Sequence, residues 1–79
     1  MLVLTRGKGD QIDVETIGII EVLETGQTGT AVSIAGNDVW LRHFQLYEMG
    51  DVSFSVKRRS ETSSAFAFDA PRNLEINRV

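Results

Sequence analysis

The sequence has no cysteine, one proline, one histidine and no long apolar run. Without cysteine the chain forms no disulfide and no cysteine-based zinc site, and His43 alone does not make a histidine-rich metal site. No stretch approaches the roughly 18 apolar residues of a membrane span, and the apolar part of the opening MLVLTRGKGD is too short for a signal peptide. We therefore expect a soluble, cytoplasmic protein with no metal, no cofactor and no membrane partner.

Signatures of catalysis are also lacking. There is no cysteine nucleophile and no G-x-S-x-G motif to accompany His43. The two glycines of residues 6–10 (RGKGD) span too short a segment to cradle a phosphate, and no lysine–serine pair follows them. The carboxylates of Asp10, Asp13 and Glu15 match no known cation-binding loop. We expect neither an enzyme nor a small-molecule substrate.

Size and composition predict one small domain that spans residues 1–79. The chain has 79 residues, of which 42% are hydrophobic and 24% are charged. A domain of this size buries about 60% of its unfolded surface, and its core rarely contributes more than about 3–5 kcal/mol. Because disulfides and metals are excluded as additional support, idealised packing or a partner subunit is left, and of the two we expect a partner subunit, as in a homodimer.

Charge is unevenly distributed along the chain. The net charge is −3, from 8 basic and 11 acidic residues. Residues 1–50 carry three basic and seven acidic side chains, whereas residues 51–79 carry five basic and four acidic ones. The acidic total argues against an extensive basic footprint for nucleic acid, but a local one is compatible with it. Residues 57–59 (KRR) are either a phosphate contact or a solvated turn.

Hydrophobicity alternates with a period of two, which is typical of half-buried β-strands. Turn residues separate the alternating segments, as at 7–10, 26–29 and 36–38. The segments expected to form strands are MLVLTR, IGIIEVLE, TAVSI, VWLRH, VSFSVKR, SAFAFDA and LEINRV. The sequence predicts an all-β fold, a small antiparallel sandwich or barrel.

One segment departs from this alternation. Residues 42–49 have mixed spacing and stop at Gly50, which suits the left-handed cap of a short helix. The aromatic residues Trp40, Phe44 and Tyr47 lie in or beside this segment. We expect them in the core, and stacking on nucleic-acid bases is the alternative.

Residues 18–43 and 52–78 share a pattern of three strands separated by turns. The aligned positions are mostly apolar and fall at the same place in each strand: Ile20 and Val22 with Phe54 and Val56, residues 30–34 with 64–68, and residues 39–41 with 74–76. The match is one of pattern rather than identity, and alternating strands alone also produce such a match.

The two ends of the chain resemble one known family. The opening MLVLTRGKGDQI is similar to the first strand and turn of the carbon storage regulators (CsrA/RsmA), small bacterial RNA-binding proteins. Their start reads M-L-[IV]-L-[ST]-R, followed by a turn with glycine and an acidic residue. The closing FAFDAPRNLEINR is similar to the family's fourth strand, its Ala-Pro turn and its fifth strand, which ends in arginine. Residues 1–6, Gly9 and Asp10 carry the first match, and residues 70–72 with Arg78 carry the second.

The middle of the chain differs from the family pattern. A typical member passes from the first turn to the third strand within a few residues, whereas here about half of the chain intervenes. Residues 13–50 are either an insertion or a degenerate repeat. In the family, the first and fifth strands of one chain flank the middle strands of the other. The resemblance thus implies a strand-swapped, intertwined homodimer with adjacent first and last strands, or a chain that makes some of these pairings itself.

The resemblance implies a post-transcriptional regulator that binds single-stranded GGA in RNA hairpin loops and controls translation or mRNA stability. Splayed loop bases are read by hydrogen bonds and stacking, and arginine offers a planar set of donors. The residues implied in RNA binding lie near both ends of the chain: Leu4, Thr5, Arg6, Arg72, Ile76 and Arg78. Without the resemblance, Arg6 and Arg78 are solvated charges on edge strands. The alternative function is a protein-interaction module of the same fold that has lost RNA binding and pairs with a relative or a regulator protein.

Overall fold

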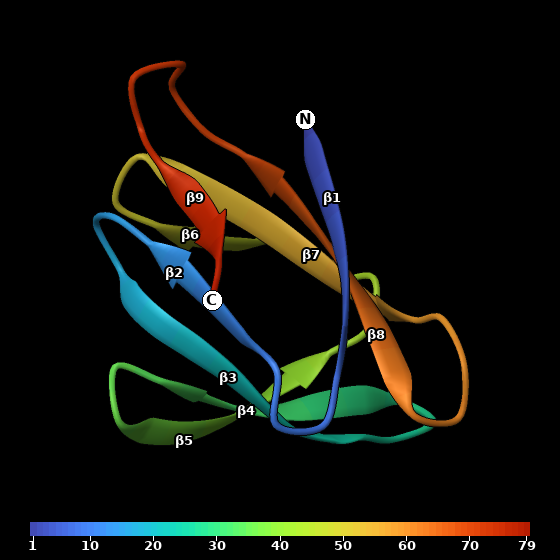
Figure 1. The fold of residues 1–79 in the computed structure, drawn as a ribbon. Helices are drawn as coiled ribbons and strands as arrows, with labels where there is room; N and C mark the ends of the chain where they lie inside the picture. Colours follow the sequence, from blue (N-terminus) through green and yellow to red (C-terminus); the bar gives the residue numbers. More distant parts are fainter.

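The computed structural model describes residues 1–79, and the chain folds into two antiparallel β-sheets (Figure 1). Sheet A has the strand order β1-β8-β7-β6, and sheet B has the order β5-β4-β3-β2-β9. The strands are β1 (Leu2–Gly7), β2 (Gln11–Val14), β3 (Gly18–Thr25), β4 (Gly29–Ile34), β5 (Asn37–Arg42), β6 (Tyr47–Met49), β7 (Val52–Arg58), β8 (Ser63–Asp69) and β9 (Ile76–Arg78). This confirms the predicted all-β sandwich. The chain forms no helix that could span a membrane.

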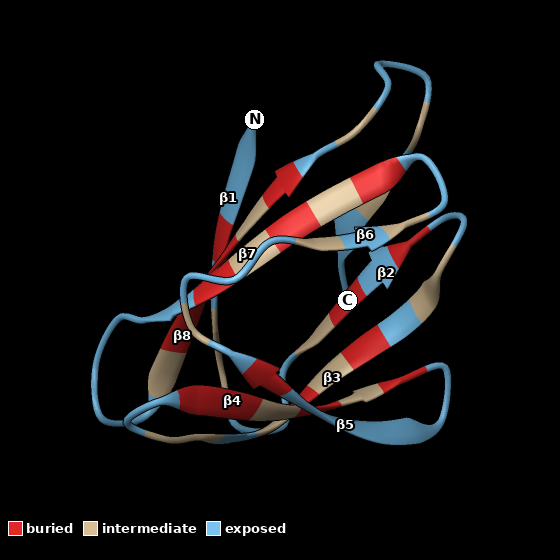
Figure 2. Ribbon diagram, turned by 180° about the vertical axis from the view of Figure 1, so that it is seen from behind, coloured by how far each residue is buried: buried red, intermediate tan, exposed pale blue.

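The core lies between the two sheets, and alternation along each strand selects its members. On β7, Val52, Phe54 and Val56 are buried while the intervening serines are partly exposed, which Figure 2 shows as bands along the strand. Phe54 packs against Phe68 of the neighbouring strand, with ring centroids 5.4 Å apart. Each large side chain buried in this way contributes about 1.5–3 kcal/mol relative to exposure. The two inner faces therefore hold the sheets together.

Two of the predicted turns occur where expected, and the third is shifted. Residues 7–10 and 26–29 each close through a backbone hydrogen bond between the first and last residue, of 3.0 and 2.8 Å. Between β4 and β5, the turn residues are instead Ala35 and Gly36, with φ angles of 50° and 85°. Two successive positive φ angles match the twist of a two-residue hairpin. Asn37 consequently belongs to β5 rather than to the turn.

The predicted helix over residues 42–49 is wrong, because a loop and the short strand β6 occupy the segment. Tyr47 lies opposite Phe54, with ring centroids 5.8 Å apart, so pairing with β7 replaces two helical turns of marginal stability. Phe44 has a φ of 63°, which is incompatible with a right-handed helix. Gly50 has a positive φ of 61°, but it turns the β6–β7 hairpin rather than capping a helix.

Only one of the three aromatic residues expected in the core packs against it. Tyr47 is partly buried against the core, whereas Trp40 is 51% exposed and Phe44 is 82% exposed. Trp40 lies on the outward side of β5, and its ring covers Gly29, where a Cβ would come within 2.5 Å of the ring. The neighbouring Leu41 takes the inward side and is fully buried, as the alternation of a strand requires.

Residues 18–43 and 52–78, which share a sequence pattern, both form strands, but the last strand of each pairs differently. Thr30 on β4 and Ser64 on β8, which the sequence pattern aligns, are both fully buried, and their hydroxyl oxygens lie 2.8 Å apart. β5 stays beside β4, but β9 leaves β8 and pairs with β2 in the other sheet, and β1 takes the place beside β8. The first and last strands thus pair with strands of the same chain, whereas the resemblance implies that they pair with strands of a second chain. Residues 13–50 supply strands to both sheets, and the swapped homodimer stays a prediction.

Candidate nucleic-acid interface

The first and last strands lie at the edges of different sheets, on the same side of the sandwich. β1 forms an edge of sheet A, and β9 forms an edge of sheet B. β1 packs across from β3, whose neighbour β2 pairs with β9. The two edge strands therefore lie on the same side of the sandwich (Figure 1), and the region between them is called the β1–β9 opening. β1 and β9 belong to different sheets and share no hydrogen bonds, so the structure does not show the predicted adjacency of the first and last strands as strand pairing.

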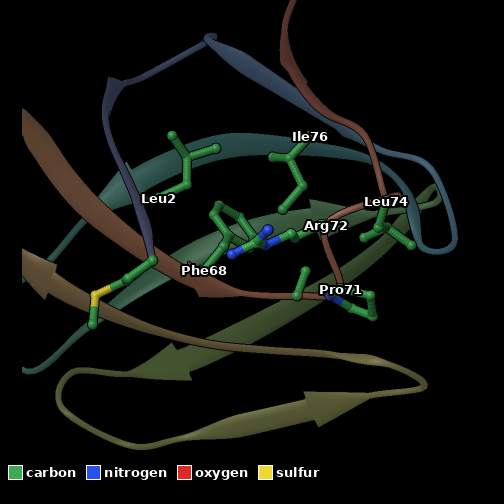
Figure 3. A pocket seen from close by; sticks show the side chains of 8 residues that line it. Leu2, Phe68, Pro71, Arg72, Leu74 and Ile76 are labelled. Carbon is green, nitrogen blue, oxygen red and sulfur yellow. The ribbon is translucent and has the colours of Figure 1, made fainter.

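A cavity of about 310 Å³ lies in the β1–β9 opening (Figure 3). Its lining residues come from the start of β1, the end of β8, the following loop and β9: Met1, Leu2, Phe68, Ala70, Pro71, Arg72, Leu74 and Ile76. Arg72 is the one charged residue among them, and its side chain extends from the loop into the cavity (Figure 3). The cavity therefore combines apolar walls with a single guanidinium group.

The loop between β8 and β9 is anchored where it carries Arg72. Pro71 has no N–H and does not continue the strand ladder, so the chain leaves sheet A at this point. The Pro71 carbonyl accepts the N–H of Leu74 at 3.0 Å. Glu75 donates its N–H to the Glu15 carboxylate at 2.9 Å and accepts the Glu15 N–H at 3.0 Å. These bonds fix the loop to the β2–β3 turn and hold Arg72 at the rim of the opening.

Strand register determines where the side chains of β9 point. Ile76 lies opposite Val14, and Arg78 lies opposite Ile12. Residues directly opposite each other point to the same face of a sheet, and both β2 residues are fully buried. Ile76 and Arg78 therefore point to the inner side of sheet B. Ile76 is partly buried and lines the cavity, while Arg78 is exposed at the sheet edge.

Arg6 supplies an unused hydrogen-bond donor on the inner side of β1. Alternation places Leu2, Leu4 and Arg6 on the same side of the strand. The Nη1 group of Arg6 donates to the Thr5 carbonyl at 2.6 Å, but Nη2 is buried and has no hydrogen-bond partner. A buried donor left unpaired costs about 1–3 kcal/mol. Because Nη2 is buried, this donor is not accessible to a ligand in the structure.

Two of the six predicted RNA-binding side chains, Arg72 and Ile76, line the cavity in the β1–β9 opening. Arg6 and Arg78 lie on the inner sides of the two edge strands, outside the lining of the cavity. Leu4 is 4% exposed and belongs to the core, so only its backbone is available to a ligand. Thr5 is exposed on the outer face of sheet A. Sequence reasoning missed Met1 and Leu2 as cavity residues; the alternation that places Leu2 on the side of Leu4 was the available signal.

Buried hydroxyl groups form a chain beside Arg6. Ser64 lies opposite Arg6, and its hydroxyl contacts those of Thr25 at 2.7 Å and Thr30 at 2.8 Å. Thr30 also contacts Nε2 of His43 at 2.9 Å. These bonds satisfy the two buried polar side chains and connect sheet A to sheet B. His43 is engaged within the fold, which favours a structural role for this residue.

The basic segment 57–59 spans the end of β7 and the start of the turn into β8. All three side chains are exposed. Arg58 Nε donates to the Ser60 carbonyl at 3.2 Å, and the Arg59 N–H donates to the Ser63 carbonyl at 2.9 Å. In the free protein the segment is a solvated turn, and its charges are available to a phosphate.

No family model matches the sequence, and no curated protein or solved structure matches it either. The resemblance to the carbon storage regulators rests on the residues at the two ends of the chain and stays a prediction.

Proposed function

We propose that the protein binds single-stranded GGA segments in RNA hairpin loops, through the β1–β9 opening, and thereby controls translation or mRNA stability. The observation that carries the proposal is that the two ends of the chain, which hold the arginines of the resemblance, meet at this opening, with Arg72 extending into its cavity. Arg6 comes from the first strand, whereas Arg72 and Arg78 come from the last 8 residues of the 79-residue chain. The β1–β8 and β9–β2 pairings bring these two ends together.

The chemistry of the opening suits an unpaired guanine. Guanine presents N7 and O6 as adjacent acceptors, which a guanidinium group binds with two parallel hydrogen bonds. Arg72 extends into the cavity and offers such a group. Leu2 and Ile76 offer apolar surface to a base that has left its stack. A volume of about 310 Å³ lies at the lower end of the range for small-ligand sites, which suits one splayed base.

One chain presents one such opening. In the family that the ends resemble, the first and fifth strands reach across to a second chain. Here β1 and β9 pair with strands of the same chain, so formation of the opening requires no partner subunit. RNA binding with one site per chain is therefore expected even at protein concentrations where the protein is monomeric.

A titration against two labelled RNA hairpins tests the proposal. One hairpin carries GGA in its loop, and the other carries the same loop bases in scrambled order; both are measured at low and moderate salt. Arg78→Ala and Arg72→Ala should each weaken GGA-loop binding by about 5- to 150-fold, since a bidentate arginine–guanine contact contributes about 1–3 kcal/mol. Arg42→Ala is the matched control, because Arg42 is an exposed arginine on β5, the opposite edge of sheet B.

Equal binding of the two hairpins would contradict the proposal. So would a loss of binding in Arg42→Ala that equals the loss in Arg78→Ala, since that result would mean general attraction between charges. In either case the alternative function, a protein-interaction module, becomes the better account of the acidic total of the chain.

A further inference from the structure

Phe44 combines a strained backbone with an exposed ring. Its φ of 63° lies in the left-handed region, which bulky residues rarely adopt, and its side chain is 82% exposed. The conformation is held by the Phe44 N–H, which donates to the Val56 carbonyl of β7 at 2.9 Å. Strained residues with exposed side chains tend to occur at ligand-binding positions. Burial in the core does not explain this ring.

The ring borders a groove on the outer face of sheet A. The groove has a volume of about 240 Å³ and is lined by Met1, Val3, Phe44, Ser55, Val56, Lys57, Ala65 and Ala67. Alanine and serine side chains from β7 and β8 leave a flat floor, and Phe44 and Val3 stand beside it. Lys57 is the one charged residue of the lining, and the exposed Arg58 and Arg59 follow it along the chain. The protein has a net charge of −3, but no carboxylate lines this groove.

The groove adjoins the β1–β9 opening. Met1 lines both the groove and the cavity in the opening. Val3 and Leu2 point to opposite sides of β1, so the two sites lie on the two faces of one edge strand. A polymer bound in the opening reaches the groove by passing over the end of β1 at Met1.

We propose that the groove binds an unpaired base of single-stranded RNA that adjoins the hairpin, with the base stacked on Phe44 and its phosphate beside Lys57. A flat aromatic ring beside a cation, without carboxylates, is the arrangement that sequence-tolerant single-strand binding uses. An anionic, planar ligand fits the charge of this groove better than an apolar protein side chain, which needs no lysine. The inference rests on the proposed function for the RNA that brings the base to the groove.

Three labelled RNA probes separate the two sites by fluorescence anisotropy. They are the GGA hairpin with a blunt stem, the same hairpin with a single-stranded tail of about eight nucleotides, and an unstructured oligonucleotide of about the same length as the tail. Wild-type protein should bind the tailed hairpin more tightly than the blunt one. We expect the tail to raise the affinity roughly tenfold. Phe44→Ala should remove this gain and leave the affinity for the blunt hairpin unchanged.

Matched variants identify the stacking interaction. Leu46 is an apolar residue that is 62% exposed, lies in the same loop and does not line the groove. Leu46→Ala should therefore leave the affinity for both hairpins unchanged. Phe44→Tyr should retain the gain from the tail, whereas Phe44→Leu should lose most of it, because leucine has no aromatic face. Lys57→Gln should reduce the gain and its salt dependence.

The outcomes distinguish the two proposals. If Phe44→Ala binds the tailed hairpin and the oligonucleotide as wild type does, the groove does not hold a base and the inference is overturned. Phe44-dependent binding of the oligonucleotide supports the groove even if the GGA and scrambled loops bind equally, a result that would overturn only the proposed function. Loss of the tail effect in Leu46→Ala as well would mean that the loop as a whole is involved, which also overturns the stacking interaction.

Discussion

Replacing Phe44 with glycine should make the protein more stable, although it removes a large aromatic side chain. A left-handed backbone costs an L-residue about 1–2 kcal/mol, whereas glycine adopts it freely. Glycine also gives the unfolded chain more conformational freedom, which lowers the free energy of unfolding by roughly 0.5–1 kcal/mol. The ring is 82% exposed, so its removal sacrifices little burial. The difference is a stabilisation of about 0–1.5 kcal/mol.

Urea unfolding followed by far-UV circular dichroism measures this change, and thermal unfolding gives a second reading. A gain of about 1 kcal/mol corresponds to an increase in Tm of about 4–8 °C for a domain of this size. Phe44→Ala is the control, because alanine keeps the left-handed strain and loses the ring, so it should be no more stable than wild type. Both variants retain the N–H that bonds to Val56. A glycine variant less stable than wild type by more than about 0.5 kcal/mol would refute the reasoning, since Phe44 would then be held by packing.

Three further predictions concern the core, the hydroxyl groups and the opening. Leu4→Ala should destabilise the protein by about 2–5 kcal/mol, as expected for a buried leucine, whereas Thr5→Ala should change the free energy of unfolding by less than about 0.5 kcal/mol; equal effects would contradict the assignment of the two sides of β1. Ser64→Ala should cost about 1–3 kcal/mol in urea unfolding because the Thr25 hydroxyl loses its partner and the Thr30 hydroxyl keeps only His43, while Ser53→Ala, at a partly exposed position, should be nearly neutral. Arg78→Ala should reduce the ratio of the affinities for the GGA hairpin and the scrambled hairpin, and an unchanged ratio together with unchanged affinity would place Arg78 outside the interface.

The strands were predictable because their residues alternate so regularly. Val52, Phe54 and Val56 are separated by serines, and only a strand with one buried face accounts for this order. The turns at 7–10 and 26–29 followed from glycine and its polar neighbours in the same way. Local pattern was sufficient wherever each residue's environment depends on its immediate neighbours.

Pairing between distant strands was not predictable from local pattern. Leu2 lies opposite Phe68 in the structure, but any other alternating strand offers β1 an equally apolar face. The segment 42–49 was misassigned for the same reason, since Tyr47 gains more from Phe54 on β7 than from two isolated helical turns. Trp40 and Phe44 were expected in the core because of their residue type, and the register of β5 and a left-handed backbone placed them outside.

The candidate site was predictable only in part. The resemblance at the two ends of the chain indicated Arg6, Arg72 and Arg78, but not that β1 and β9 belong to different sheets or that Arg72 lies in the loop before β9. Met1 carried no signal in the sequence, because its importance arises from its place between the opening and the outer groove. Sequence motifs identified residues, and the topology supplied the surface on which they meet.

Mapping of chemical shifts by NMR tests the central claim most directly. Uniformly ¹⁵N-labelled protein is titrated with the GGA-loop hairpin and, separately, with the scrambled-loop hairpin, and amide shifts are followed along the chain. The account predicts that GGA-specific shifts gather in residues 1–6 and 72–78, on both sides of the β1–β9 opening, and are absent from β5. GGA-specific shifts confined to β5 or to the β6–β7 turn, or the same shifts with both hairpins, would contradict it.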